Sequence, residues 1–236
     1  MATIGNIERG PQSLLSEYLR SIPFLAGISE ADHMILERSA SFLTLKRFEI
    51  LFHRGDVNEH LYYVCAGMMK VSSHLSLGRE VIRKICHPGM LLGEESLYGE
   101  KQHSGIAQAL DRHTHIVKIK STILRQMMKS DAYVAVQLFD YVGDRLKKSE
   151  YRLESVIAED ARTRVINFLK ENALLYGNKV GFNELLLKHN FTQQDIADFT
   201  GTSRQTVTTI LNDLKRSNVI AMNRRRILIR DVEHLA

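Results

Sequence analysis

The sequence predicts an α+β protein with an amino-terminal β-roll of the jelly-roll type, a long helix, and a carboxy-terminal domain of short helices that ends in a hairpin. Three observations predict this order. Short runs of β-branched and aromatic residues, separated by glycines, fill residues 39–119. A helical repeat follows over residues 130–159. Further helical patterns and two short apolar runs complete the chain, so we expect segments at 1–128, 129–159 and 160–236.

The composition is that of a folded protein with two domains. The chain has 236 residues, of which 44% are hydrophobic, 25% are charged and three are proline. No apolar run is long enough for a membrane span, and charged residues interrupt the amino terminus where a signal peptide would need an apolar stretch. We therefore expect a cytoplasmic protein without a membrane partner. The net charge of +5 favours a polyanionic partner.

The amino-terminal segment contains two lead-in helices followed by the roll. Helical spacing covers residues 12–38, where Pro23 divides two short segments and Ser29 opens the second. Turn residues then recur at the spacing of a sandwich or jelly roll. The predicted strands of this region include Leu61–Cys65, Met68–Ser72, Val81–Ile85 and His115–Ile119.

The long helix carries a heptad seam. Its members are spaced 3, 4, 3, 4 and 3 residues apart, and they are Phe139, Val142, Leu146, Ser149, Leu153 and Val156. A long helix between two domains has few internal neighbours, so this seam predicts pairing with a second copy rather than docking on the chain's own sheet. Ser149 interrupts the apolar seam, where a polar group fixes the register or touches something bound at the interface.

Residues 191–214 have the pattern of a helix-turn-helix. Thr192 and Asp195 are three residues apart, as in a capping box, and Gly201 supplies the turn. Thr202 or Ser203 then caps a second helix whose inward positions are Val207, Ile210, Leu211 and Leu214. The opposite face is polar and consists of Ser203, Arg204, Gln205, Thr208, Thr209 and Asn212. Arginine can bond guanine, glutamine can bond adenine and threonine can touch a thymine methyl, so this face predicts base contacts in the major groove of DNA.

The last two strands form a basic hairpin. Two apolar runs bracket Asn223, Arg224, Arg225 and Arg226, which would lie on phosphates as a wing. Residues 191–230 hold seven basic and three acidic side chains, so the basic excess is concentrated here. The alternative is an ordinary helical hairpin with a solvated face. In that case the cap, the turn and the apolar positions would each match a helix-turn-helix by coincidence. The sequence-predicted DNA contacts are Thr192, Thr202, Ser203, Arg204, Gln205, Thr208, Thr209, Arg224, Arg225 and Arg226.

The cysteines and histidines indicate no metal or cluster. Two cysteines, Cys65 and Cys86, are too few for a disulfide framework, a four-cysteine zinc site or an iron–sulfur cluster, and we expect buried free thiols. Ten histidines invite a haem or metal hypothesis, but no pair has helical ligand spacing with a supporting acid. The chain also has no nucleophile elbow, phosphate loop or metal-ligand motif, so we expect no enzymatic activity.

Over nearly its whole length the chain resembles the cyclic-AMP receptor protein and fumarate–nitrate regulator superfamily, called Crp/Fnr. The matching pieces are Phe52-His-Arg-Gly-Asp with Leu61-Tyr-Tyr-Val and Gly67, then Gly93-Glu94, the long helix, and Thr202-Ser-Arg-Gln-Thr-Val. The resemblance implies a homodimeric transcription regulator. Its rolls, which are cyclic-nucleotide-binding-like, would sense an effector, and its winged helices would read a palindromic operator in double-stranded DNA. It also implies RNA polymerase as a partner, through residues 171–183.

The resemblance implies a set of effector residues in the roll and on the long helix. They are Gly93, Glu94, Glu95, His103, Ser104, Arg145 and Ser149. Nucleotide-binding members hold the phosphate with an Arg-Ser pair, and His103 and Ser104 stand at that position here. Glu94 matches the carboxylate that bonds a ribose hydroxyl, and Ser149 the hydroxyl that meets the base. No cofactor follows from the residues themselves; the resemblance implies a cyclic nucleotide or another small effector.

Two other hypotheses stay open beside an effector-controlled regulator. The first is an effector-independent DNA-binding protein whose degenerate roll serves only as a scaffold. The second is a regulatory subunit of an enzyme that uses the roll as a nucleotide switch. The family's best-known member uses an arginine, a glutamate and a second arginine on the second helix of this motif. This chain has Arg204, Gln205 and Thr209 at those positions, and the resemblance therefore implies a different operator. The iron–sulfur sensors are excluded because residues 1–38 contain no cysteine.

Overall fold

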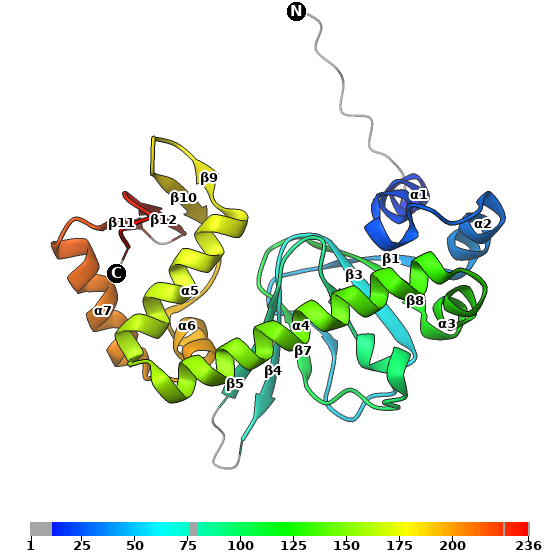
Figure 1. Cartoon of the computed structure of the whole chain (residues 1–236), viewed down its shortest axis with the longest axis horizontal. Helices are drawn as coiled ribbons and strands as arrows, with labels where there is room; N and C mark the ends of the chain where they lie inside the picture. Colours follow the sequence, from blue (N-terminus) through cyan, green and yellow to red (C-terminus); the bar gives the residue numbers. More distant parts are fainter. Residues whose placement is uncertain (1–10, 76–79, 224, 236) are drawn as a thin grey trace, which may run out of the picture. The chain divides into compact units, whose positions relative to one another are not determined.

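The computed structural model describes residues 11–75, 80–223 and 225–235. By their contacts the residues form two units, Met1–Ser73 with Lys84–Asp144, and His74–Arg83 with Arg145–Ala236 (Figure 1). The chain passes between the units at three places: within the fourth strand, the fifth strand and the long helix. The boundaries expected at 128 and 159 follow changes of sequence pattern, whereas these units follow contacts, so the division into three segments stays a prediction.

The amino-terminal unit contains the predicted β-roll. Two four-stranded sheets have the orders β1-β8-β3-β6 and β2-β7-β4-β5. The four strands named from the sequence are β3, β4, β5 and β8, each within two residues of its predicted ends. The strands are β1 (Ser41–Leu45), β2 (Ile50–Phe52), β3 (His60–Ala66), β4 (Met69–His74), β5 (Glu80–Cys86), β6 (Leu91–Leu92), β7 (Ile106–Ala109) and β8 (Thr114–Lys120).

Apolar side chains from both sheets fill the interior of the roll. Val64, Met69 and Ile116 have no exposed surface. Both cysteines are free, with Cys86 buried and Cys65 half-buried. Burial raises the pKa of the Cys65 thiol to about 12, so this thiol stays protonated at neutral pH.

Helices cover the roll and close a second apolar core. They are α1 (Pro11–Ser21), the 3-10 turn η1 (Pro23–Leu25), α2 (Glu30–Ser39), α3 (Ser121–Ser130) and the first part of α4 (Ala132–Ala158). Leu19, Leu36 and Leu124 are fully buried in this core. The predicted start of the second lead-in helix is confirmed, because the Ser29 hydroxyl accepts a hydrogen bond of 3.1 Å from the amide of Asp32.

The long helix, α4, begins at Ala132, two residues after the start that the sequence pattern predicts. Ser130 ends α3, a separate helix that the pattern does not predict. Asp131 separates the two helices with extended dihedrals (φ −129°, ψ 109°), and its carboxylate accepts from the amide of Tyr133 at 2.8 Å. This local side-chain bond satisfies a free amide at the start of α4.

The carboxy-terminal unit has the element order of a winged helix. A four-stranded sheet has the order β11-β12-β10-β9, and α5 and α7 pack on it, while α6 packs on these two helices. Gly177 ends α5, where a Cβ atom would lie 2.3 Å from the carbonyl oxygen of Ala173, so only glycine fits. The elements are α5 (Ala161–Tyr176), β9 (Asn178–Lys179), β10 (Leu185–Lys188), α6 (Gln193–Thr200), α7 (Arg204–Arg216), β11 (Ile220–Asn223) and β12 (Arg226–Ile229).

No helix in the described part of the chain combines the length and the apolar character that a membrane crossing requires.

Candidate nucleic-acid interface and effector pocket

The first helix of the helix-turn-helix begins with the predicted capping box. The Thr192 hydroxyl accepts from the amide of Asp195 at 3.0 Å, and the Asp195 carboxylate accepts from the amide of Thr192 at 2.8 Å. Gly201 then ends α6 in the left-handed region (φ +68°), a conformation that favours glycine. This pair of bonds fixes where α6 starts, and the glycine fixes the turn that leads into α7.

The second helix, α7, begins at a cap provided by Ser203 rather than Thr202. The Ser203 hydroxyl accepts from the amide of Thr206 at 3.0 Å. All four predicted inward positions are confirmed as buried, with no more than 6% exposure: Val207, Ile210, Leu211 and Leu214. Since these four residues anchor one face of α7, the opposite face is presented outward.

The outward face of α7 contains most of the predicted base-contacting residues. Ser203, Arg204, Gln205 and Thr209 are exposed. Thr208 is half-buried, and its hydroxyl lies 2.7 Å from the side-chain oxygen of Gln193 on α6. The hydroxyl of Thr208 therefore braces α7 against α6, and base contacts would come from its exposed neighbours.

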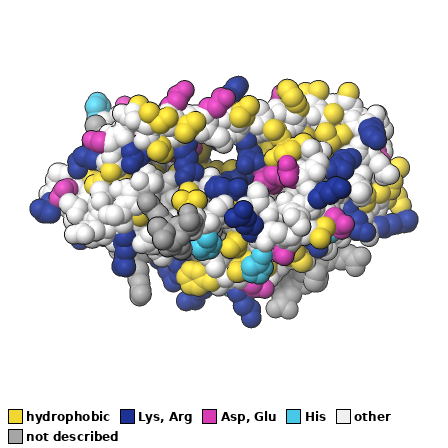
Figure 2. Space-filling model, turned by 90° about the horizontal axis from the view of Figure 1, so that it is seen from below, with side chains coloured by type: hydrophobic (Ala, Val, Ile, Leu, Met, Phe, Trp, Pro, Cys, Tyr) yellow, Lys and Arg dark blue, Asp and Glu magenta, His cyan; other side chains and the backbone are white. Residues whose placement is uncertain are grey.

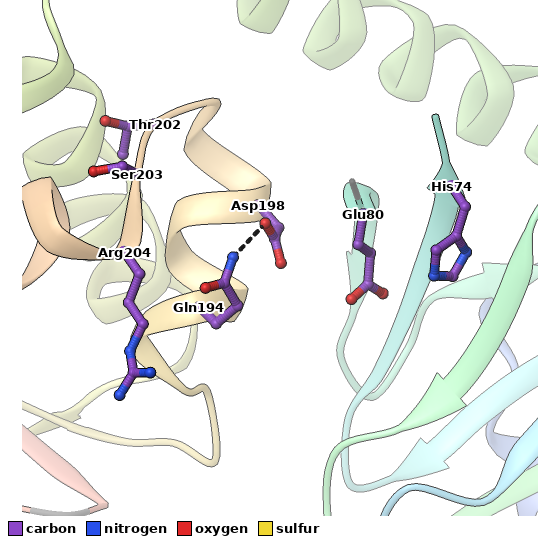
Figure 3. Close-up of a pocket in the computed structure, with 7 residues that line it drawn as sticks. All are labelled: His74, Glu80, Gln194, Asp198, Thr202, Ser203 and Arg204. Atoms are coloured by element: carbon purple, nitrogen blue, oxygen red, sulfur yellow. Dashed lines mark hydrogen bonds between the residues drawn. The ribbon is translucent and has the colours of Figure 1, made fainter. Parts of the chain in front are cut away.

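A pocket lies at the amino-terminal end of α7. Its lining includes Thr202, Ser203 and Arg204 together with two residues of α6, Gln194 and Asp198 (Figure 3). The side-chain amide of Gln194 donates to the Asp198 carboxylate at 2.7 Å, which holds this acid along α6. The remaining lining residues are His74 and Glu80, from the ends of β4 and β5.

The wing is the hairpin formed by β11 and β12. Asn223 pairs with Arg226 at its end, and the Asn223 side chain accepts from the amide of Arg225 at 3.2 Å. Arg225 and Arg226 are exposed, whereas Arg224 lies outside the described residues. The carbonyl of Arg225 accepts from the amide of His189 at 3.0 Å, which ties the hairpin to the segment before α6.

Basic side chains are widespread on the surface. On the face drawn in Figure 2, lysine and arginine (dark blue) cover more of the surface than aspartate and glutamate (magenta), in keeping with the net charge of +5. A positive surface attracts a polyanion over the range of a Debye length, about 8 Å at physiological salt.

In the roll, Gly93 precedes a short 3-10 helical segment, η2 (Glu94–Tyr98), of which Glu94 is the first residue. Gly93 has φ +73°, and a Cβ atom there would lie 2.5 Å from the carbonyl oxygen of His60. Only glycine fits this position. The Glu94 side chain is 2% exposed and forms an ion pair of 3.3 Å with Lys84 on β5. Its neighbour Glu95 is half-buried.

Lys84 is the centre of a buried polar network that sequence reasoning missed. Its ammonium group donates to the carbonyl of Leu91, to the Glu94 carboxylate and, at 3.4 Å, to the hydroxyl of Tyr141 on α4. That hydroxyl also accepts from the amide of Leu91 at 2.8 Å. The network thus joins β5, β6, η2 and α4 within the amino-terminal unit.

His103, at the position implied for a phosphate-binding arginine, points into the protein. It is 4% exposed, and its ring stacks on Phe52 with centroids 3.6 Å apart and an interplanar angle of 4°. Burial lowers the pKa of His103, so the ring is neutral at pH 7. The adjoining Ser104 is exposed. A cyclic nucleotide phosphate needs a charged donor at this position, and His103 and Ser104 do not fit it.

The remaining implied effector residues belong to the other unit. Arg145 and Ser149 lie on the part of α4 that follows Asp144, and the Ser149 hydroxyl donates to the carbonyl of Arg145 at 3.0 Å. The side chain of Ser149 is exposed at the surface of the helix. Gly93, Glu94, Glu95, His103 and Ser104 therefore belong to the unit that contains the roll, whereas Arg145 and Ser149 belong to the other unit.

The seam of α4 is uncovered in a single chain. Phe139 is 76% exposed, Leu146 is 60% and Leu153 is 62%, while Val156 is 48% exposed and Val142 is half-buried. A row of large apolar side chains at this exposure is unusual on a helix that has no partner. The row has the spacing that pairs two helices in a coiled coil.

Two protein families match this chain. The family described as "Cyclic nucleotide-binding domain" matches residues 42–131, and the one described as "Crp-like helix-turn-helix domain" matches residues 163–236. The first match covers the roll from β1 to α3, and the second covers α5 to the end of the chain. Their order along the chain is the order that the sequence predicts.

Similar proteins come from several bacteria. A CRP-like cAMP-activated global transcriptional regulator of Mycobacterium tuberculosis is 25% identical over 94% of this chain and 98% of its own length. The cyclic AMP receptor protein of Thermus thermophilus is 28% identical over 77% of this chain and 80% of its own. The structure of FixK2 from Bradyrhizobium japonicum shares the fold, with a TM-score of 0.74 and 23% identity over 83% of this chain and 95% of that one.

Proposed function

The chain belongs to the Crp/Fnr superfamily of DNA-binding transcription regulators, and from this premise we propose that it acts in the cytoplasm as a homodimer on a palindromic operator. Each copy presents one helix-turn-helix, so two copies read two half-sites. Half-sites of such dimers lie about one helical turn of DNA apart. Recognition of the operator is a binding event without a chemical reaction, and we assign the chain no enzymatic activity.

The observation that carries this proposal is the polar outward face of α7. Arg204 and Gln205 lie on the first turn, which enters the major groove in helix-turn-helix proteins, and both are exposed. Arg204 supplies a fork for guanine and Gln205 a donor–acceptor pair for adenine. Thr209 lies one turn further along the same face, where its methyl group suits thymine. Arg225 and Arg226 of the wing would bind phosphates without reading sequence.

The exposed seam of α4 supports the homodimer. Burying one leucine side chain contributes about 1.5–3 kcal/mol, and a two-fold axis counts each seam residue twice. Phe139, Leu146 and Leu153 of both chains would therefore favour pairing, against the cost of the lost translational and rotational freedom.

The roll would receive a small effector, but of a kind other than a cyclic nucleotide held by its phosphate. Glu94 is already paired with Lys84, and the neutral ring of His103 stacks on Phe52. The same two observations favour the second candidate, a regulator that binds DNA without an effector and keeps the roll as a scaffold. Thermal shift with cyclic AMP, cyclic GMP and a metabolite panel separates them, since only an effector of the native state raises the melting temperature.

RNA polymerase is the proposed partner beyond DNA. The region from 171 to 183 begins with the last residues of α5, which ends at Tyr176, and continues beyond Gly177. Large apolar side chains are exposed around this helix end: Leu174 at 59%, Val180 at 53% and Phe182 at 89%. Such a patch marks a surface for a protein partner.

Titration of the purified protein with duplex DNA tests the proposal. Because each bound phosphate releases counterions, the logarithm of the association constant should fall linearly with the logarithm of salt concentration. Six to ten phosphate contacts would lower the affinity by about 10³ to 10⁵ between 50 mM and 200 mM salt. A protein that binds no duplex, at low salt and with every candidate effector, would exclude the proposed function.

A further inference from the structure

Arg152 on α4 has an unusual set of partners. Its guanidinium group donates to the carbonyl of Arg83 at 2.8 Å, to the carbonyl of Ile82 at 2.7 Å and to the carbonyl of Phe199. The guanidinium carbon also lies 4.0 Å from the centroid of the Phe199 ring. One side chain therefore joins three elements of the carboxy-terminal unit, namely α4, the end of β5 in this unit and α6.

These partners are main-chain carbonyls rather than a carboxylate. Arg152 is largely withdrawn from water, and desolvation lowers its pKa, so the charge is held by oriented dipoles and by the aromatic face of Phe199. The rigid planar fork of a guanidinium group fixes the directions in which it donates to these carbonyl oxygens, whereas the donors of an ammonium group rotate. The site thus selects arginine for its geometry.

Two arginines approach the end of α6, and they differ in what else they bind. Phe199 and Thr200 lie in the last turn of α6, where free carbonyls form the negative end of the helix dipole. Arg164 on α5 donates to the carbonyl of Thr200 at 2.8 Å and, with its other nitrogen, to the carbonyl of Glu159. Arg152 also reaches β5, whereas Arg164 binds the end of α6 and Glu159 in the short segment between α4 and α5.

Ile82 and Arg83 stand next to a place where the chain passes between the units. The next residue, Lys84, belongs to the amino-terminal unit and donates to the hydroxyl of Tyr141 on α4. β5 therefore contacts α4 on both sides of this boundary. Lys84 of β5 binds Tyr141 of α4, and Arg152 of α4 binds the carbonyls of Ile82 and Arg83 of β5.

We propose that Arg152 is a positioning residue for DNA binding: it sets the pose of α6, and with it the helix-turn-helix, against α4 and β5. This inference rests on the proposed function. Arg152 touches neither bases nor phosphates, yet operator affinity depends on it, because the helix-turn-helix must be held at the angle that two half-sites require.

The test compares Arg152→Gln with the matched control Arg164→Gln. Both substitutions remove a guanidinium from the end of α6, so both should lower the melting temperature. For Arg152→Gln we expect a loss of about ten- to a hundredfold in affinity for an operator duplex at fixed salt. For Arg164→Gln we expect a loss below about threefold, because the bonds to β5 remain. Arg152→Lys should fall between the two, since an ammonium group restores the charge but not the fork.

The distance between α4 and α7 is a second readout, and a loss of stability alone would leave it unchanged. Nitroxide labels attached through Glu154→Cys on α4 and Lys215→Cys on α7 would report the pose without DNA. The native thiols are buried or half-buried, and the raised pKa of Cys65 slows its labelling. In dimers formed with an excess of unlabelled chain, so that each holds one labelled copy, we expect one narrow distance distribution in the parent and in the Arg164→Gln background, and a broad one with Arg152→Gln.

Equal affinity losses for Arg152→Gln and Arg164→Gln, or a distance distribution that Arg152→Gln leaves narrow, would overturn the positioning role. If Arg152→Gln does not fold, Arg152→Lys decides by the same two measurements. A parent protein that binds no duplex would refute the proposed function, and the label distances would still test the positioning role independently.

Discussion

The buried ion pair between Lys84 and Glu94 can be tested quantitatively through Lys84→Met. The lysine side chain is 11% exposed and the glutamate side chain 2%, with 3.3 Å between the ammonium nitrogen and the carboxylate oxygen. Methionine keeps much of the apolar stem but leaves the carboxylate without its cation. Breaking a buried pair in this way costs about 3–5 kcal/mol. Because the lysine retains some exposure, we expect the lower end, about 3 kcal/mol of unfolding free energy in the amino-terminal unit.

Urea unfolding at pH 7 measures this loss. The chain has eight tyrosines and no tryptophan, so tyrosine fluorescence and circular dichroism are suitable signals. The double variant Lys84→Met/Glu94→Gln removes both buried charges and should be more stable than Lys84→Met, which a double-mutant cycle would report as coupling between the two residues. If Lys84→Met lowers the unfolding free energy by less than about 1 kcal/mol, the ion pair contributes no more than an exposed surface pair does, and the buried network is refuted. A double variant no more stable than Lys84→Met would refute the coupling.

Further substitutions test the reading face, the wing, the seam and the core of the winged helix. Arg204→Ala should weaken operator binding by about 1–3 kcal/mol and relax the preference at one base pair, measured by fluorescence anisotropy on duplexes altered one position at a time. Arg225→Ala should weaken binding to all duplexes alike and reduce the salt slope by about 1. Leu153→Asp should convert the dimer to a monomer in sedimentation velocity, and a dimer that survives would contradict the seam. Burial lowers the pKa of His189 below 6.5, so the unfolded chain takes up this proton more readily than the folded one. The carboxy-terminal unit should therefore lose stability as pH falls below about 6.5, and His189→Asn should flatten this pH dependence in thermal melts.

Features with local signals could be predicted from the sequence. The capping box of Thr192 and Asp195, the turn at Gly201 and the apolar face of α7 each depend on residues within four positions of one another. The main strands of the roll could be placed because β-branched runs and glycine turns alternate there. Local propensity and tertiary structure agree in these segments, as expected where the chain needs no long-range contact to choose its conformation.

Features that depend on distant partners could not be predicted. Lys84 binds a residue 57 positions away, and Arg152 binds residues 70 and 47 positions away. No periodicity connects such positions. The short helix α3 was missed because it follows β8 directly, and its capping residue, Lys120, makes no side-chain cap bond. The inward turn of His103 depends on the Phe52 ring and not on its own neighbours.

Selection of bound sequences from random duplexes tests the central claim most directly, since it asks of the full chain whether it reads DNA and how. Recovery of a palindromic motif is the expected result, with half-sites about one helical turn apart and a guanine contact that disappears with Arg204→Ala. Recovered pools no different from the starting library would contradict the account. So would an enriched motif that Arg204→Ala leaves unchanged.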